Sequence, residues 1–242
     1  GFAHIRAELD TGREIEVHID STQELITCNL PARTPASLKS LLGFMPPLGQ
    51  IREDEALLTR DNLLRYIDTP VAPHHLRNHI YQLLSAEQQD SLKQIIHETW
   101  NNTTLGNVGY DIASGLLYCP YTEGHDTGEI AFGGQGFQIW LQLMTHLVRL
   151  SDCATIVLDE PEIYLHPEKQ HTLIQAFRDN FDGSMIIATH SSELMNEVDF
   201  SHIIHVQRRT NSAKPIPTQN RERLEVRWSP KLGQVVKSGF CS

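Results

Sequence analysis

The second half of the chain alternates short apolar runs with longer stretches of helical periodicity. The apolar runs cover residues 154–158, 184–188 and 202–207, and helical patterns cover residues 167–180 and 192–198 between them. Short apolar runs are typical of strands buried on both faces, and strands that alternate with helices build a parallel sheet with crossover helices. We therefore predict an α/β fold for this half of the chain.

The first of these runs ends in two adjacent carboxylates, Asp159 and Glu160, followed by Pro161. Ligands of open α/β sheets bind at the carboxyl ends of the strands. Asp159 would hold Mg²⁺ there, and Glu160 would orient or deprotonate an attacking water. The alternative is a strand that leads into a helix N-terminus, where acidic residues favour the helix dipole.

The next apolar run ends at His190, thirty residues beyond Glu160. A histidine at this edge, beside the carboxylate strand, can donate a hydrogen bond to a γ-phosphate. A lone histidine is more often a structural group with satisfied hydrogen bonds. Its pairing with Asp159 and Glu160 at this spacing favours the functional interpretation.

A glycine-rich loop precedes the carboxylate strand and opens a predicted helix over residues 136–150. Glycines at a helix N-terminus let backbone N–H groups approach an anion, and the helix dipole favours phosphate. The candidate ligand-binding residues of this loop are Gly133, Gly134, Gln135 and Gly136. The alternative is a glycine-rich turn that only caps the helix.

A turn after the carboxylates adds the last candidate, His166, directly before Pro167. Its alternative is a plain turn with proline in the first helical turn.

The first half of the chain has a different organisation. Residues 2–28 alternate polar and apolar side chains, as in an antiparallel sheet, and residues 52–100 have helical periodicity with a capping box at 85–88. We expect four parts: a β-rich part at 1–50, a helical arm or insertion at 51–100, a core with the candidate site residues at 101–207 and a basic tail at 208–242.

Composition narrows the classes of protein that fit. The 242 residues carry a formal charge of −10, which argues against a surface that coats nucleic acid throughout. The four cysteines form no C-x-x-C pair, and no apolar run approaches the roughly 20 residues that span a bilayer. We therefore expect a cytoplasmic protein with no membrane segment.

In their order and spacing, these motifs resemble those of ABC-type ATPases, and more closely the SMC-like, overcoming-lysogenization-defect-like AAA-family proteins of bacteria. The resemblance is dense over residues 132–199 and looser over 41–58. It implies an ABC-type P-loop NTPase-like fold. In it the glycine loop would be the signature motif, Asp159-Glu160 the Walker B pair, the turn at His166 the D-loop, and His190 the switch histidine.

The same resemblance implies ATP and Mg²⁺ as cofactors and a homodimer or higher oligomer that closes around nucleotide through the ATPase face. Proteins of these families act on or sense DNA, or control an effector or nuclease partner in antiphage defence. A non-hydrolysing scaffold that assembles a larger complex is the alternative, and a transporter subunit is disfavoured by the turn at His166.

Two features depart from the family pattern. No G-x-x-x-x-G-K-[ST] motif occurs in the sequence. We expect this P-loop in a segment before Gly1; a second chain could also supply it, or nucleotide binding could be lost. The common serine of the signature loop is replaced by Phe132, which removes one hydroxyl contact and favours slow hydrolysis or a gating role.

Two further groups of residues rank lower as sites. His74, His75 and His79 could mimic a metal pair, but without a carboxylate or cysteine at matching spacing we expect a solvated helix face. The basic residues after Val206 could contact phosphate, although a solvated edge is the more common use of such a charge pattern.

Overall fold

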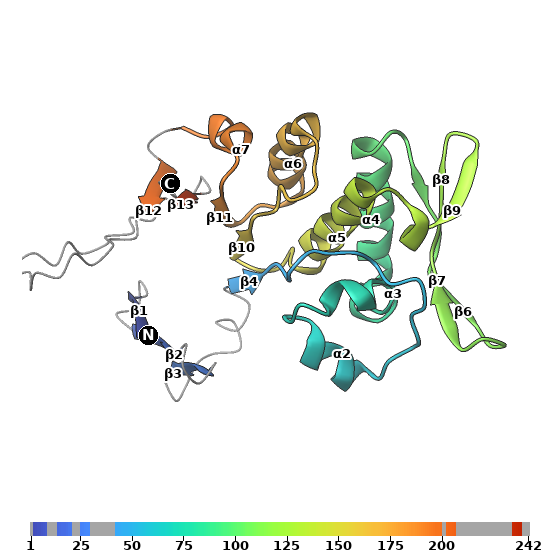
Figure 1. Cartoon of the computed structure of the whole chain (residues 1–242), viewed down its shortest axis with the longest axis horizontal. Coiled ribbons are helices and arrows are strands. Elements are labelled where there is room, and N and C mark those ends of the chain that lie inside the picture. The colour runs from blue at the N-terminus through green and yellow to red at the C-terminus, as the bar shows by residue number, and fades with distance from the viewer. Residues whose placement is uncertain are drawn as a thin grey trace, which may run out of the picture. The chain divides into compact units, whose positions relative to one another are not determined.

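The structure is a computed structural model of the chain, and it describes residues 2–8, 14–20, 25–29, 42–199, 202–206 and 234–238. Side chains are described for residues 42–199, 202 and 203. The chain divides into two compact units, Gly1–Leu42 and Gly43–Ser242 (Figure 1).

The first unit holds an antiparallel sheet with the strand order β1-β2-β3. Its strands are β1 (Phe2–Glu8), β2 (Glu14–Asp20) and β3 (Leu25–Asn29). Consecutive strands pair as neighbours in antiparallel register. The alternating pattern of residues 2–28 therefore predicted this sheet correctly.

The second unit contains the sheet that carries the candidate site. Its strand order is β12-β13-β11-β10-β4, and its strands are β4 (Leu42–Phe44), β10 (Thr155–Asp159), β11 (Ser184–Thr189), β12 (Ile203–Val206) and β13 (Gln234–Ser238). β11 is parallel to both β10 and β13, and β13 is parallel to β12. The prediction of a parallel sheet with α/β architecture is confirmed.

The position of β13 was not anticipated. It lies between β11 and β12, although its residues belong to the stretch that we expected to be an irregular basic tail. An alternating polar and apolar piece of the same stretch, at 224–228, lies outside the described residues.

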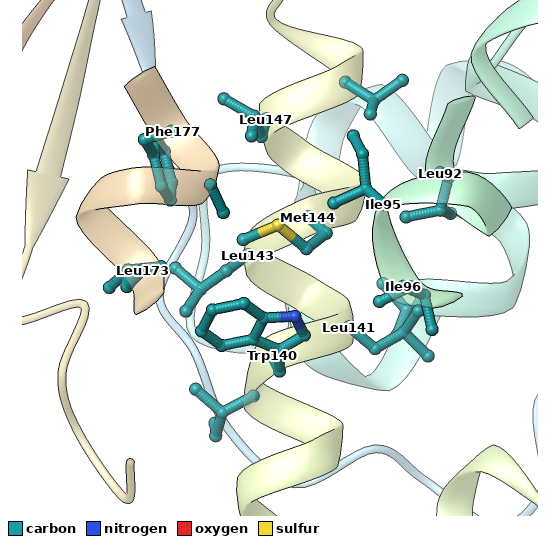
Figure 2. Packing of buried hydrophobic residues seen from close by; sticks show 14 of the residues in the cluster. Leu92, Ile95, Ile96, Trp140, Leu141, Leu143, Met144, Leu147, Leu173 and Phe177 are labelled. Carbon is teal, nitrogen blue, oxygen red and sulfur yellow. The ribbon is translucent and has the colours of Figure 1, made fainter. Parts of the chain in front are cut away.

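Helix α5 (Gln135–Arg149) is the centre of the hydrophobic core. Every residue from Phe137 to Val148 is buried. One side of α5 packs against α4 (Ala86–Thr99) and another against α6 (Pro167–Asn180) (Figure 2). Helix α6 begins and ends where the sequence predicted, and α7 (Ser192–Asn196) follows β11.

The helical residues before α4 add Leu76 and Ile80 to the same core. They form α2 (Arg60–Tyr66), the 3-10 turn η1 (Ala72–His75), α3 (Leu76–Asn78) and the π-helical turn η2 (His79–Leu83). Helix α4 starts at the expected capping box, in which the Ser85 side chain accepts from the Gln88 N–H and the Gln88 side chain accepts from the Ser85 N–H.

Two small antiparallel sheets lead into the glycine loop. One has the order β5-β8-β9, with β5 (Thr104–Leu105), β8 (Pro120–Glu123) and β9 (Asp126–Glu129), and the other pairs β6 (Gly109–Asp111) with β7 (Leu116–Tyr118). After β9 comes the 3-10 turn η3 (Ile130–Phe132), which enters the loop directly.

Among the described residues, every helix is too short or too polar to cross a bilayer.

Candidate functional site

The carboxyl ends of β10 and β11 bring Glu160 and His190 together. In the parallel register Asp159 lies opposite Ala188, and the Glu160 N–H donates to the Ala188 carbonyl at 2.8 Å. His190 Nε2 lies 3.3 Å from Glu160 Oε1, with side chains that are 43% and 51% exposed. A carboxylate and an imidazole that touch each other yet remain open to solvent can exchange protons with a ligand.

Glu160 has an unusual backbone. Its φ of 44° lies in the left-handed region, which non-glycine residues rarely adopt. Tyr164, with φ of 61°, repeats this conformation four residues later. Such strain persists only where surrounding contacts hold it, and it is concentrated at functional sites.

Asp159 ends β10 and is exposed. In the described part of the chain its carboxylate accepts no hydrogen bond and forms no ion pair. The described residues hold no cluster of three histidine, cysteine or acidic side chains able to bind a metal. An unpaired carboxylate suits Mg²⁺, which keeps several waters and binds one or two carboxylates together with substrate phosphates.

Glu162 is a site residue that the sequence did not reveal. Its Oε1 accepts hydrogen bonds from the Thr189 hydroxyl and from the N–H groups of His190, at 3.1 Å, and Ser191, at 3.2 Å. The carboxylate thus fixes the backbone that carries His190 to the turn after Glu160. The sequence signal that could have identified Glu162 is its position as a third acidic residue close to Asp159 and Glu160.

The glycine loop is tight on one side and open on the other. A Cβ atom added at Gly133 would lie 2.7 Å from Cδ1 of Phe137, whereas one added at Gly134 would meet nothing within 4 Å. Gly134 is the N-cap of α5, and Gln135, its first residue, is exposed. The first N–H groups of α5 are therefore placed where an anion would be stabilised.

The glycine loop lies beside the turn that follows Glu160. A Cβ atom at Gly136 would be 3.5 Å from the Tyr164 carbonyl oxygen. His166 is the exposed N-cap of α6, and its carbonyl accepts from the Lys169 and Gln170 N–H groups. The structure gives the His166 backbone a helix-capping position.

The expectation for the histidines before α4 was wrong. His79 is fully buried, and its ring meets that of His146 edge-on at 5.2 Å between centroids. Among the residues that the structure describes, neither ring nitrogen of His79 has a hydrogen-bond partner. Burial, reinforced by the charge of Arg149, lowers the pKa of His79 to about 3. His79 therefore belongs to the core rather than to a solvated helix face, because η2 places it against α5.

The rings of Trp100 and Trp140 lie 5.8 Å apart between centroids and are tilted by 41° to each other. Trp140 is fully buried, so the pair belongs to the core. Trp228 lies outside the described residues.

Comparisons with known proteins agree with this architecture. The family model described as "AAA domain, putative AbiEii toxin, Type IV TA system" matches residues 36–196, about two thirds of the chain. No curated protein sequence matches.

Several solved structures are similar at low identity. An SMC head bound to the C-terminal winged-helix domain of ScpA is 12% identical, with a TM-score of 0.45 over 82% of this chain and 68% of that one. The SMC head domain from Thermotoga maritima is 13% identical, with a TM-score of 0.39 over 82% and 67%. A third match, from work on ATP-driven dimerization and DNA-stimulated activation of SMC ATPases, is 13% identical, with a TM-score of 0.41 over 46% and 72%.

Those TM-scores are too low to carry an argument, so the assignment rests on the family model. Because that model covers well over half of its residues, the chain belongs to the AbiEii-type AAA domain family.

Proposed function

We propose that this chain carries the hydrolytic half of a Mg²⁺-dependent ATPase site. The observation that supports this most is the contact of Glu160 with His190 at the carboxyl edge of the parallel sheet, one residue beyond Asp159, whose exposed carboxylate accepts no hydrogen bond from the described residues. In a family of AAA domains, this edge is where the phosphates of ATP are expected.

Each residue has a role that its chemistry supports. Asp159 would hold Mg²⁺, which when bound neutralises charge on the phosphate oxygens. Glu160 would orient the attacking water and accept its proton as the bond to the leaving phosphate oxygen breaks. His190, held by Glu162 through its backbone, would donate a hydrogen bond to the transferred phosphate.

The glycine loop would act from the opposite subunit of a dimer. Gly134 and Gln135 are exposed, and Gly134 has open space where a side chain would stand. An exposed helix N-terminus presents its N–H groups and the positive end of its dipole outwards, which suits an anion bound by a second copy. Gly133, Gly134, Gln135 and Gly136 would therefore complete the site in trans.

ATP turnover by the full-length protein tests this function. Glu160→Gln is expected to lower kcat by about 100-fold or more, the size of a lost general base, and to trap a nucleotide-bound dimer that appears as a doubled mass. Glu168→Gln, which makes the same change at an exposed carboxylate in the first turn of α6, should leave turnover unchanged. Equal rates for the wild type and Glu160→Gln would refute the hydrolytic role.

A non-hydrolysing scaffold is the second candidate, and Phe132 favours it. Its ring stands at the serine position of the signature loop and is 70% exposed, with no hydroxyl to offer a phosphate. A scaffold would assemble in ATP without turnover, and Phe132→Ser would not create any. In an ATPase limited by this loop, Phe132→Ser is expected to raise kcat.

For the biological role we propose action on DNA, or control of an effector, in antiphage defence. The name of the family, with its toxin and its toxin–antitoxin system, supports a defence role. Stimulation of turnover by double-stranded DNA would test the first activity. Turnover that is unaffected by DNA, and a full-length protein that protects cells from no phage, would argue against this role.

A further inference from the structure

A buried arginine connects the helical residues before α4 to the base of the glycine loop. The side chain of Arg77, in α3, is fully buried. It forms a two-pronged pair with Glu129, with Nε to Oε1 at 2.8 Å and Nη2 to Oε2 at 2.6 Å. Nη1 donates to Glu55 Oε2 at 3.1 Å and to the Arg52 carbonyl at 2.9 Å. One guanidinium thus joins three separate stretches of chain.

Glu129 is the last residue before the turn that enters the loop. Its Oε2 also accepts the Ala131 N–H at 2.8 Å, and its Oε1 accepts the Cys119 N–H at 3.0 Å. The carboxylate therefore caps η3, the turn that ends at Phe132. Moving Glu129 would move the start of the glycine loop.

Gln138, in α5, holds the same loop from the other side. Its Nε2 donates to the carbonyls of Ala131 and Gly133, at 2.8 and 2.9 Å, and its Oε1 accepts the Ile51 N–H. The loop backbone is thus fixed from beneath by two buried side-chain systems while Gly134 remains open above. Such an arrangement holds a binding loop in one position before its ligand arrives.

The two carboxylates paired with Arg77 accept their other hydrogen bonds from different parts of the chain. Glu55 accepts from the Arg77 and Asn78 N–H groups and from the Asn78 side chain, all within α3. Of the two carboxylates, Glu129 is the one that accepts a hydrogen bond from the turn that enters the glycine loop. Burial by itself would lower the pKa of Arg77, but its hydrogen bonds to Glu129 and the charges of both carboxylates raise it, so the guanidinium stays charged.

We propose that Arg77 is a positioning residue for the glycine loop. Through Glu129 it couples α3 to η3, so that a displacement of the helical residues 60–83 changes the position of Phe132, Gly133 and Gly134. The inference rests on the proposed function, because the loop is taken to complete a second subunit's ATP site.

Three substitutions in the full-length protein test the coupling. Arg77→Lys keeps the charge but cannot form the two-pronged pair, and Glu129→Gln keeps the shape but loses the charge. Both are expected to lower kcat by about tenfold with the KM for ATP changed by less than about twofold, because the loop would act in the transition state rather than in binding ATP. Glu55→Gln disturbs the same buried arginine without touching the loop, and it should leave kcat within about twofold.

Thermal unfolding and amide hydrogen exchange separate positioning from general destabilisation. Arg77→Lys and Glu129→Gln should speed exchange across residues 131–138, whereas Glu55→Gln should not, even where its melting temperature falls as far. Losses of kcat that follow the melting temperature equally in all three variants would overturn the proposal.

A wild-type protein without turnover would count against the proposed function alone. The exchange measurement would still decide the coupling in that case, since unchanged exchange at 131–138 in Arg77→Lys overturns it.

Discussion

Acid is expected to unfold the second unit through a buried pair of histidines. His79, at the start of η2, lies against His146 of α5, and both side chains are at most 3% exposed. Arg149 donates from Nε to His146 Nδ1 at 3.2 Å, so His146 is neutral with its proton on Nε2. Burial, with the nearby charge of Arg149, lowers the pKa of both histidines. His75 faces His79 from η1 and acts in the same direction.

The direction and size of this pH dependence follow from the linkage between proton binding and folding. A histidine whose pKa is depressed by folding contributes stability above its unfolded pKa, and that stability is lost as pH falls towards the folded value. Between its ordinary pKa of 6.5 and about pH 4.5, His79 alone should reduce the free energy of unfolding by about 2.7 kcal/mol, at about 1.36 kcal/mol per pH unit. His146, whose pKa is lowered by burial and by the charge of Arg149, adds to this loss in the same direction.

Urea unfolding followed by tryptophan fluorescence measures this loss, since Trp140 is fully buried in the same core. Replacing His79 by leucine should remove about 2.7 kcal/mol of the pH dependence between pH 6.5 and 4.5. It should not destabilise the protein at pH 7, because two unpaired nitrogens leave the core. His97→Gln, at an exposed position of α4, is the control and should keep the wild-type slope. Equal slopes for the wild type and His79→Leu would refute the reasoning.

Four further substitutions test the packing and the loop. Ser85→Ala removes the capping box of α4 and should cost about 1 kcal/mol in urea unfolding. Leu143→Ala leaves a cavity at a fully buried position of α5 and should cost about 2–5 kcal/mol. Gly133→Ala forces a methyl group against Phe137 and should cost about 1–3 kcal/mol, whereas Gly134→Ala should leave the melting temperature unchanged. A Gly134→Ala variant that melts as early as Gly133→Ala would contradict the open geometry of the loop.

The parallel sheet was predictable because its strands are short, apolar and separated by amphipathic helices. Helix α6 was found to the residue because Pro167 sets its start, and β10 was found because its apolar run stops at Asp159. Local chemistry determines both boundaries, so no knowledge of tertiary contacts was needed.

Other features depend on contacts between distant residues and could not be predicted. β13 carries only a short apolar pair, Val235 and Val236, and becomes a strand because β11 and β12 pair with it on both sides. His79 looked like a surface residue because burial depends on what η2 packs against rather than on its own neighbours in sequence. The ion pair of Arg77 with Glu129 joins residues that are 52 positions apart in the sequence. Composition and periodicity do not predict contacts at such a separation.

The candidate site divides its work between exposed and buried groups. The exposed groups at the sheet edge are Asp159, Glu160 and His190. Substituting them removes little packing, so it should lower turnover without changing the free energy of unfolding. Arg77 and Gln138 are buried beneath the glycine loop, where the same change disturbs backbone that several elements share. A reacting group must meet water and phosphate, whereas a group that positions a loop does so best where water cannot compete for its hydrogen bonds. Substitutions at the edge should therefore separate activity from stability, and substitutions beneath the loop should change both together.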